Sequence, residues 1–95
     1  KSVMKIVIDN LEEAIKLIET PTHEMYLHIF DSFIMYHFSK NEIEVTKFVV
    51  KEPYLVIDFI INKKNYKAVG EKLLTYFEKT EEFEYCKSVF DILKN

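Results

Sequence analysis

Two histidines and one glutamate are the residues of this chain that could form a catalytic or metal site. Glu24, His28 and His37 lie in and just before the apolar segment MYLHIFDSFIMYHF, residues 25–38. If this segment is a β-hairpin that turns at residues 31–32, the two histidines become diagonal neighbours on one face, roughly 7–8 Å apart at the backbone. Two imidazoles and a carboxylate can hold zinc or iron, or act as an acid–base pair.

The competing interpretation of the same segment is a packed structural hairpin whose histidines have no chemical role. Histidines are ordinary residues on half-exposed strands, and the convergence of this pair depends entirely on where the hairpin turns. We therefore predict a structural hairpin, with no catalytic residue, no metal site and no cofactor, and keep the enzyme as an alternative.

A lysine-rich stretch, NKKNYK, is the second candidate site. Lys63, Lys64 and Lys67 stand at the start of a predicted helix, where ammonium groups and backbone amides together could contact an anion. A further alternative is an accessory module for single-stranded nucleic acid. It would use these lysines together with two other lysines and two tyrosine rings on which bases could stack. Its residues would be Lys47, Lys51, Lys63, Lys64, Lys67, Tyr54 and Tyr66.

Composition limits these alternatives. The 95 residues are 48% hydrophobic and 31% charged, which is typical of a folded domain. The net charge is −3 and no residue is arginine, so nucleic acid is a disfavoured partner. With Gly70 as the only glycine, glycine-rich phosphate loops and strained nucleophile turns are excluded.

The expected location is cytoplasmic. Cys86 is the only cysteine, so the chain cannot form an internal disulfide, and this fits a reducing compartment. Charged residues interrupt every long apolar run, and the first residues reach acidic side chains too early for a secretory signal. We therefore expect no contact with a membrane.

Spacing of apolar residues predicts the secondary structure. Residues 10–19 form a helix that an Asp9–Glu12 pair starts, and residues 3–8 are either its extension or, preferably, a strand. Strands follow in 25–38, 41–51 and 54–61, with 54–61 the most buried. A helix over 66–79 buries Tyr66, Val69, Leu73 and Phe77, and a last helix buries Phe83, Cys86, Phe90 and Leu93.

These elements predict one α+β domain over residues 1–95. Its sheet is a four-stranded antiparallel meander, with residues 3–8 as an optional fifth strand. An N-terminal helix and a C-terminal two-helix hairpin pack on it. Within that hairpin, Phe83-Glu84-Tyr85-Cys86 resembles the start of the second helix of the UVR paired-helix motif, although Phe90-Asp91 replaces the expected Arg-Asp pair. The resemblance covers about a quarter of the chain and implies a protein-binding hairpin.

The function that these observations favour is noncatalytic protein binding, as in a small acidic regulator, inhibitor, immunity protein or adaptor. Six tyrosines and eight phenylalanines are more than one small core readily hides, and tyrosine is favoured at interfaces. On the predicted hairpin, Tyr26, Phe30 and Tyr36 would form the partner-binding patch. Because an open meander leaves edge strands unpaired, a homodimer is also expected.

Overall fold

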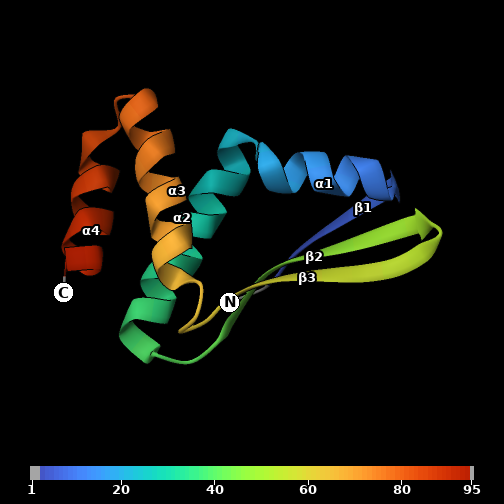
Figure 1. Ribbon diagram of the computed structural model, residues 1–95, viewed down its shortest axis with the longest axis horizontal. Helices are drawn as coiled ribbons and strands as arrows, with labels where there is room; N and C mark the ends of the chain where they lie inside the picture. The colour runs from blue at the N-terminus through green and yellow to red at the C-terminus, as the bar shows by residue number, and fades with distance from the viewer. Residues whose placement is uncertain (1–2, 95) are drawn as a thin grey trace.

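The computed structural model describes residues 3–94 and is an α+β fold (Figure 1). Three strands and four helices follow one another in this part of the chain. Their order is β1 (Met4–Asn10), α1 (Leu11–Glu19), α2 (His23–Ser39), β2 (Ile43–Glu52), β3 (Tyr54–Ile61), α3 (Tyr66–Lys79) and α4 (Phe83–Lys94).

The sheet differs from the predicted meander in size and in strand direction. Its order is β1-β2-β3, with β1 parallel to β2 and β2 antiparallel to β3. Parallel strands need a crossover connection, and here α1 and α2 supply it. Ile6 lies opposite Phe48, which lies opposite Ile57, and all three point to the inner face. The prediction of a four-stranded antiparallel meander is therefore wrong, while the α+β class is confirmed.

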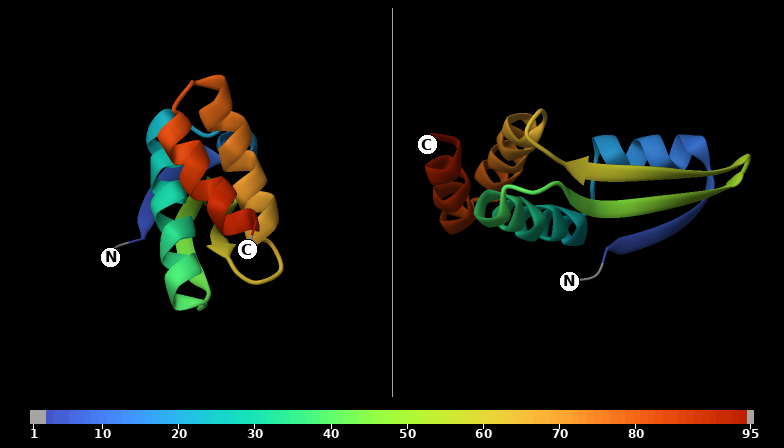
Figure 2. Two further views of the ribbon diagram at one scale, coloured as in Figure 1. Left: turned by 90° about the vertical axis from the view of Figure 1, so that its left-hand side faces the viewer. Right: turned by 90° about the horizontal axis from the view of Figure 1, so that it is seen from below.

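The segment predicted as a hairpin is the long helix α2. The Thr22 side chain caps its start by accepting a hydrogen bond from the Met25 amide at 3.2 Å, and Lys40 ends it in the left-handed conformation, with φ 62°. The helix lies between the α3–α4 pair and the sheet, as Figure 2 shows. A helix that is buried on several sides is apolar all round, and this concealed the helical period in the sequence.

The larger core lies among α2, α3, α4 and one end of the sheet. We call it the helical core; its centre consists of fully buried side chains, including Phe33, Leu73, Phe77 and Val89. Gly70 permits the close approach of α3, because an added Cβ would lie 2.8 Å from Leu93 Cδ2 and 3.0 Å from Phe33 Cζ. The predicted bounds of α3 and its inward stripe are confirmed.

The last helix turns inward a face that differs in part from the one predicted. Phe83 and Phe90 are exposed, whereas Val89 is buried in the helical core. Thr80 ends α3 instead of starting α4. The other two residues of the predicted stripe, Cys86 and Leu93, do pack against the helical core, so the prediction for this helix is correct in part.

The smaller core lies between the sheet and α1, and we call it the sheet core. Ile8, Ala14, Met25, Phe48 and Val50 are its buried members. The bounds of β3 are as predicted and its inner face contributes to this core. However, β3 is an edge strand, so the central strand β2 is more deeply buried, contrary to prediction.

The N-terminal segment is a strand, as preferred, and it leads directly into α1. Asn10, one residue later than predicted, is the cap: its Oδ1 accepts a hydrogen bond from the Glu13 amide at 3.0 Å. The Glu13 carboxylate in turn accepts from the Asp9 amide at 3.2 Å. This reciprocal arrangement resembles a capping box.

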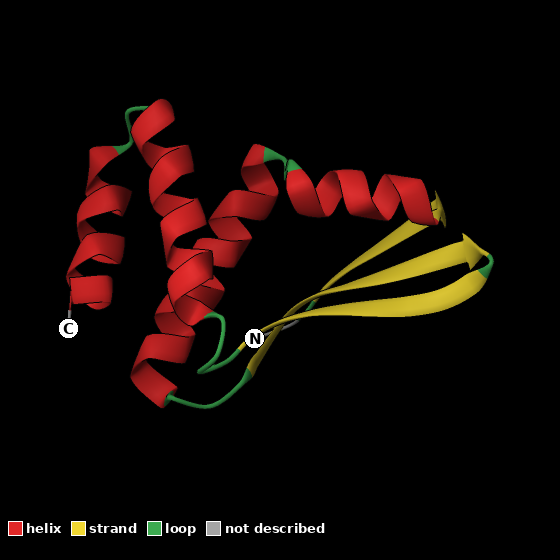
Figure 3. Cartoon of the chain, viewed as in Figure 1, coloured by secondary structure: helices red, strands yellow, loops and turns green. Residues whose placement is uncertain are grey.

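All four helices lie on one face of the sheet or beyond one of its ends (Figure 3). No element within residues 3–94 covers the other face. A row of three valines, Val7, Val49 and Val56, crosses that outer face between rows of charged side chains.

Candidate functional site

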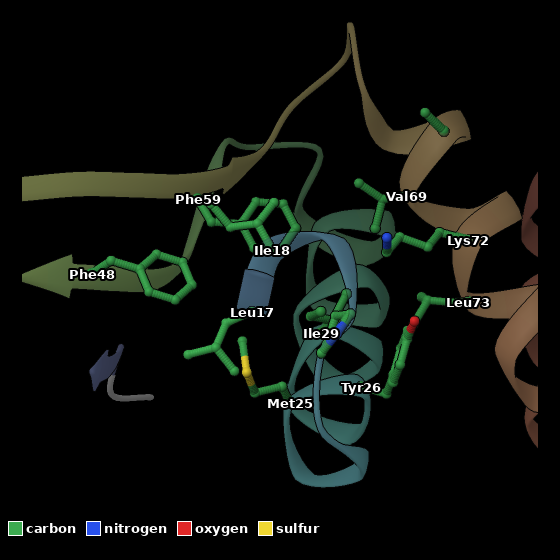
Figure 4. A pocket seen from close by; sticks show the side chains of 12 residues that line it. Leu17, Ile18, Met25, Tyr26, Ile29, Phe48, Phe59, Val69, Lys72 and Leu73 are labelled. Carbon is green, nitrogen blue, oxygen red and sulfur yellow. The ribbon is translucent and has the colours of Figure 1, made fainter. Parts of the chain in front are cut away.

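An apolar cavity of about 200 Å³ opens where α1, α2, α3 and the inner face of the sheet meet. Figure 4 shows side chains from all four parts of the fold around it. Its walls include Leu17 and Ile18 of α1, Phe48 and Phe59 of the sheet, and Val69 and Lys72 of α3.

Among the residues that the structure describes, Lys72 is the one charged side chain at this cavity, and it is exposed. It reaches from α3 toward the C-terminal end of α1, where its Nζ donates to the Glu19 carbonyl oxygen at 3.1 Å. No carboxylate of residues 3–94 pairs with it. The ammonium group has three donors, so it can bind an anionic group and keep this contact.

Tyr26 is the second polar side chain in the cavity wall. It is 9% exposed, and its hydroxyl makes no hydrogen bond within the described chain. Burial raises the pKa of this hydroxyl, and the neighbouring Tyr76 raises it further. The group is therefore a neutral donor at physiological pH.

A small aromatic cluster adjoins the cavity. The rings of Tyr26 and Tyr76 stack with their centroids 3.6 Å apart, and the Tyr76 hydroxyl lies 2.5 Å from His23 Nδ1. His23 is exposed at the first turn of α2. The cluster fixes α2 against α3 and orients the Tyr26 ring that lines the cavity.

An exposed apolar stripe on α1 lies beside the cavity and reaches it at Ile18. Leu11, Ile15 and Ile18 are 40%, 46% and 41% exposed. Ile18 lines the cavity beside Phe59, and helical spacing places Ile15 and Leu11 on the same side of the helix. Together with the partly exposed inner side of β3, they form what we call the α1–β3 groove: Leu11, Ile15, Ile18, Leu55, Ile57 and Phe59.

The width of the sheet explains why the groove is open. A helix is about 10 Å across and strands are about 4.8 Å apart, so one helix covers two strands. α1 packs on β1 and β2 through Ala14 and Leu17, and the inner side of β3 is left without a helix of its own.

The aromatic residues predicted to bind a partner lie inside the protein. Tyr26 and Tyr36 are buried and Phe30 is partly buried, all three in the helical core. Their predicted exposure assumed a strand pair, and that assumption is wrong because the segment is a central helix. The predicted aromatic interface is therefore absent; the open sheet still has β1 and β3 as edge strands, and the homodimer stays a prediction.

The two histidines do not converge. They lie nine residues apart on α2, which is about two and a half turns, so they point to opposite sides. His28 Nε2 donates to the Val45 carbonyl oxygen at 2.7 Å and ties α2 to β2, while His37 Nδ1 lies 3.5 Å from Lys40 Nζ. Glu24 is exposed, and residues 3–94 contain no group of three or more His, Cys, Asp or Glu that could hold a metal ion.

The lysines fall into two separate groups. Lys63, Lys64 and Lys67 are exposed before and within the first turn of α3. The amides of Lys64 and Asn65 there already donate to the Asn62 side chain, at 2.9 and 3.1 Å.

Lys47 and Lys51 lie on the outer face of the sheet. They form ion pairs with Glu44 and Asp58 and with Asp9, respectively. The two groups do not form one basic surface.

Sequence reasoning missed Lys72, Tyr76 and the outward direction of the α1 stripe. Lys72 and Tyr76 flank the predicted stripe of α3 at a spacing of four, which is a weak signal because lysines commonly flank a buried stripe. Leu11, Ile15 and Ile18 follow helical spacing, but spacing alone does not show whether the chain covers that side of the helix.

Comparisons with known proteins do not assign this chain to a family. No family model matches this chain, and neither the curated proteins nor the solved structures include a significant match. Within the described residues, no helix is long and apolar enough to cross a membrane.

Proposed function

We propose that this chain is a noncatalytic protein-binding domain that takes an amphipathic helix of a partner into the α1–β3 groove. The observation that carries the proposal is the stripe of Leu11, Ile15 and Ile18. All three aliphatic side chains are about two-fifths exposed or more, at helical spacing, beside an apolar cavity.

The stripe is a source of binding free energy. Fully burying one such side chain is worth about 1.5–3 kcal/mol, so covering the exposed part of each contributes about 1 kcal/mol. Singly exposed apolar residues need no explanation, but a contiguous apolar patch marks an interaction site.

A helix fits the shape of the groove better than an extended segment. The groove runs beside α1 above β3, and a second helix placed there would complete the layer on the inner face of the sheet. Such helix-in-groove binding uses apolar residues at spacings of three and four as anchors. An acidic residue near one end of the partner helix would lie close to Lys72, which has no carboxylate partner among the described residues.

The test is retention of a partner from an extract of the native host by a tagged chain and two variants. Ile15→Lys places a charge in the centre of the groove. Phe83→Lys, the matched control, does the same at an exposed apolar residue of α4. We expect a specific chain to be retained by the wild type and by Phe83→Lys and to be lost with Ile15→Lys.

Three results would count against the proposal. A wild-type chain that retains nothing lacks a partner, and equal retention by Ile15→Lys places the interface elsewhere. Loss with Phe83→Lys alone would favour the α3–α4 hairpin. Mass spectrometry of the retained chain distinguishes a different protein from a second copy.

A cytoplasmic location is part of this proposal. Cys86 is half-buried, and burial raises the pKa of its thiol, to which Glu78 adds a smaller effect. A protonated, partly covered thiol suits a structural residue in a reducing compartment.

A further inference from the structure

We infer that the cavity at the end of the α1–β3 groove binds a small apolar carboxylate, with its hydrocarbon part inside the cavity and its carboxylate on Lys72. This inference does not depend on the proposed protein partner. It rests on the size of the cavity and on the two polar groups in its wall.

The cavity has the size and the lining for a short hydrocarbon. An engineered apolar cavity of about 150 Å³ binds benzene, so about 200 Å³ is enough for one ring or a chain of about six carbons. The walls from Leu17, Ile29, Phe48 and Phe59 present apolar atoms, and such ligand sites are typically apolar with a few convergent polar groups.

Lys72 selects the charge of the ligand. Its ammonium stands at the edge of this apolar space with a backbone carbonyl as its partner, and no carboxylate of residues 3–94 neutralises it. Lys72 is exposed at the mouth of the cavity, so an anionic group can reach its ammonium while the rest of the ligand enters the apolar space. A carboxylate next to a hydrocarbon chain matches both features.

Tyr26 supplies a second polar group to the cavity wall. Its hydroxyl makes no hydrogen bond within residues 3–94 and is not among the buried polar atoms there, so it is available as a donor. A ligand oxygen at the mouth of the cavity could accept from it. Stacking on Tyr76 holds the ring in place, so the site needs little rearrangement.

Hexanoate and 1-hexanol are suitable probes because they share a six-carbon chain and differ in charge. We would titrate each into the purified, ¹⁵N-labelled chain and follow the backbone amides by NMR. For hexanoate we expect saturable shifts at Ile29 and Val69, which line the cavity. Small shifts at Phe83, which is exposed on α4, would serve as the internal control.

The variant Lys72→Met keeps the apolar stem and removes the charge. Because Lys72 is exposed, we expect hexanoate affinity to fall about threefold or more while 1-hexanol affinity stays the same. Lys64→Met is the matched control, since Lys64 is exposed at the start of α3, and should bind hexanoate like the wild type.

A second variant tests the cavity itself. Ala68→Leu adds bulk at the mouth of the cavity on an exposed position of α3, where leucine is tolerated, and should weaken both probes. The inference is overturned if hexanoate gives no saturable shifts at the cavity residues, or if Lys72→Met binds it as tightly as the wild type. It is also overturned if Ala68→Leu leaves both affinities unchanged.

Discussion

The helical core is enclosed on all sides by other elements, whereas the sheet core is covered only in part. In the helical core, α2, α3, α4 and the end of the sheet surround one another, and Phe33, Phe77 and Val89 have no exposed surface. In the sheet core, the nine-residue helix α1 covers β1 and β2 of the three strands, and aliphatic side chains remain exposed beside it.

The comparison separates the part of the molecule that maintains the fold from the part that is free to bind. Packing on all sides stabilises the helical core, and the apolar residues that stay exposed there, Phe83 and Phe90, lie on the outer side of α4. On the inner side of β3 the layer of helices is incomplete, and apolar side chains of α1 and β3 are partly exposed. Both proposed sites lie there.

The largest difference between the two regions should appear in stability. Phe33→Ala removes a fully buried ring of the helical core and should cost about 3–5 kcal/mol. Ile57→Ala removes a partly exposed side chain of β3 and should cost under about 2 kcal/mol. Chemical denaturation measures both, and equal losses would contradict the difference in closure.

A smaller effect distinguishes the two histidines of α2. His28→Ala leaves the carbonyl of the buried Val45 without its hydrogen bond and should cost about 1–3 kcal/mol. His37→Ala removes a weak contact near the surface and should change stability by less than about 0.5 kcal/mol. Equal losses of stability in the two variants, measured by chemical denaturation, would show that the hydrogen bond from His28 to β2 does not stabilise the fold.

Tyr26→Phe should change stability by less than about 0.5 kcal/mol. The variant keeps the ring in the helical core and removes a hydroxyl that makes no hydrogen bond in the described chain and is not a buried atom. Removing such a group neither breaks a contact nor relieves a burial cost. A thermal melt in which the variant is clearly less stable would mean that the hydroxyl has a partner in the folded protein.

The smallest expected effect is a pH dependence on the outer face of the sheet. The hydrogen bond that Lys47 Nζ donates to Asp58 Oδ1, 2.8 Å long, holds the pKa of Asp58 below its ordinary value. A lowered pKa stabilises the fold above the unfolded-state pKa, and this contribution is lost as the pH falls below about 4. Stability should therefore fall more steeply with acid in the wild type than in Lys47→Met; parallel curves would contradict this.

Elements with one apolar and one polar side were predicted correctly from the sequence. The helix over 66–79 has one apolar side, and the strand over 54–61 alternates, so the bounds of both were predicted correctly. The helix over 23–39 could not be recognised from periodicity, because burial against both the sheet and α3 makes it apolar all round.

The binding surface was harder to predict than the fold. An apolar stripe shows that a helix face avoids water, but it does not show whether the chain itself covers that face, and Leu11, Ile15 and Ile18 are exposed. The cavity joins Lys72 to residues more than forty positions away in the sequence, such as Tyr26 and Ile18. That proximity exists once α1, α2 and α3 have packed, so no local pattern reveals it.

The central claim is that the region with the open layer, and not the closed helical region, binds a partner. The most direct test places a photoreactive phenylalanine analogue at residue 15 and, in a second protein, at residue 83, and irradiates each in cells of the native host. Both positions are exposed and apolar in the wild type. We predict a discrete cross-linked product from position 15 and none from position 83. A product from position 83 alone, or from neither position, would contradict the claim.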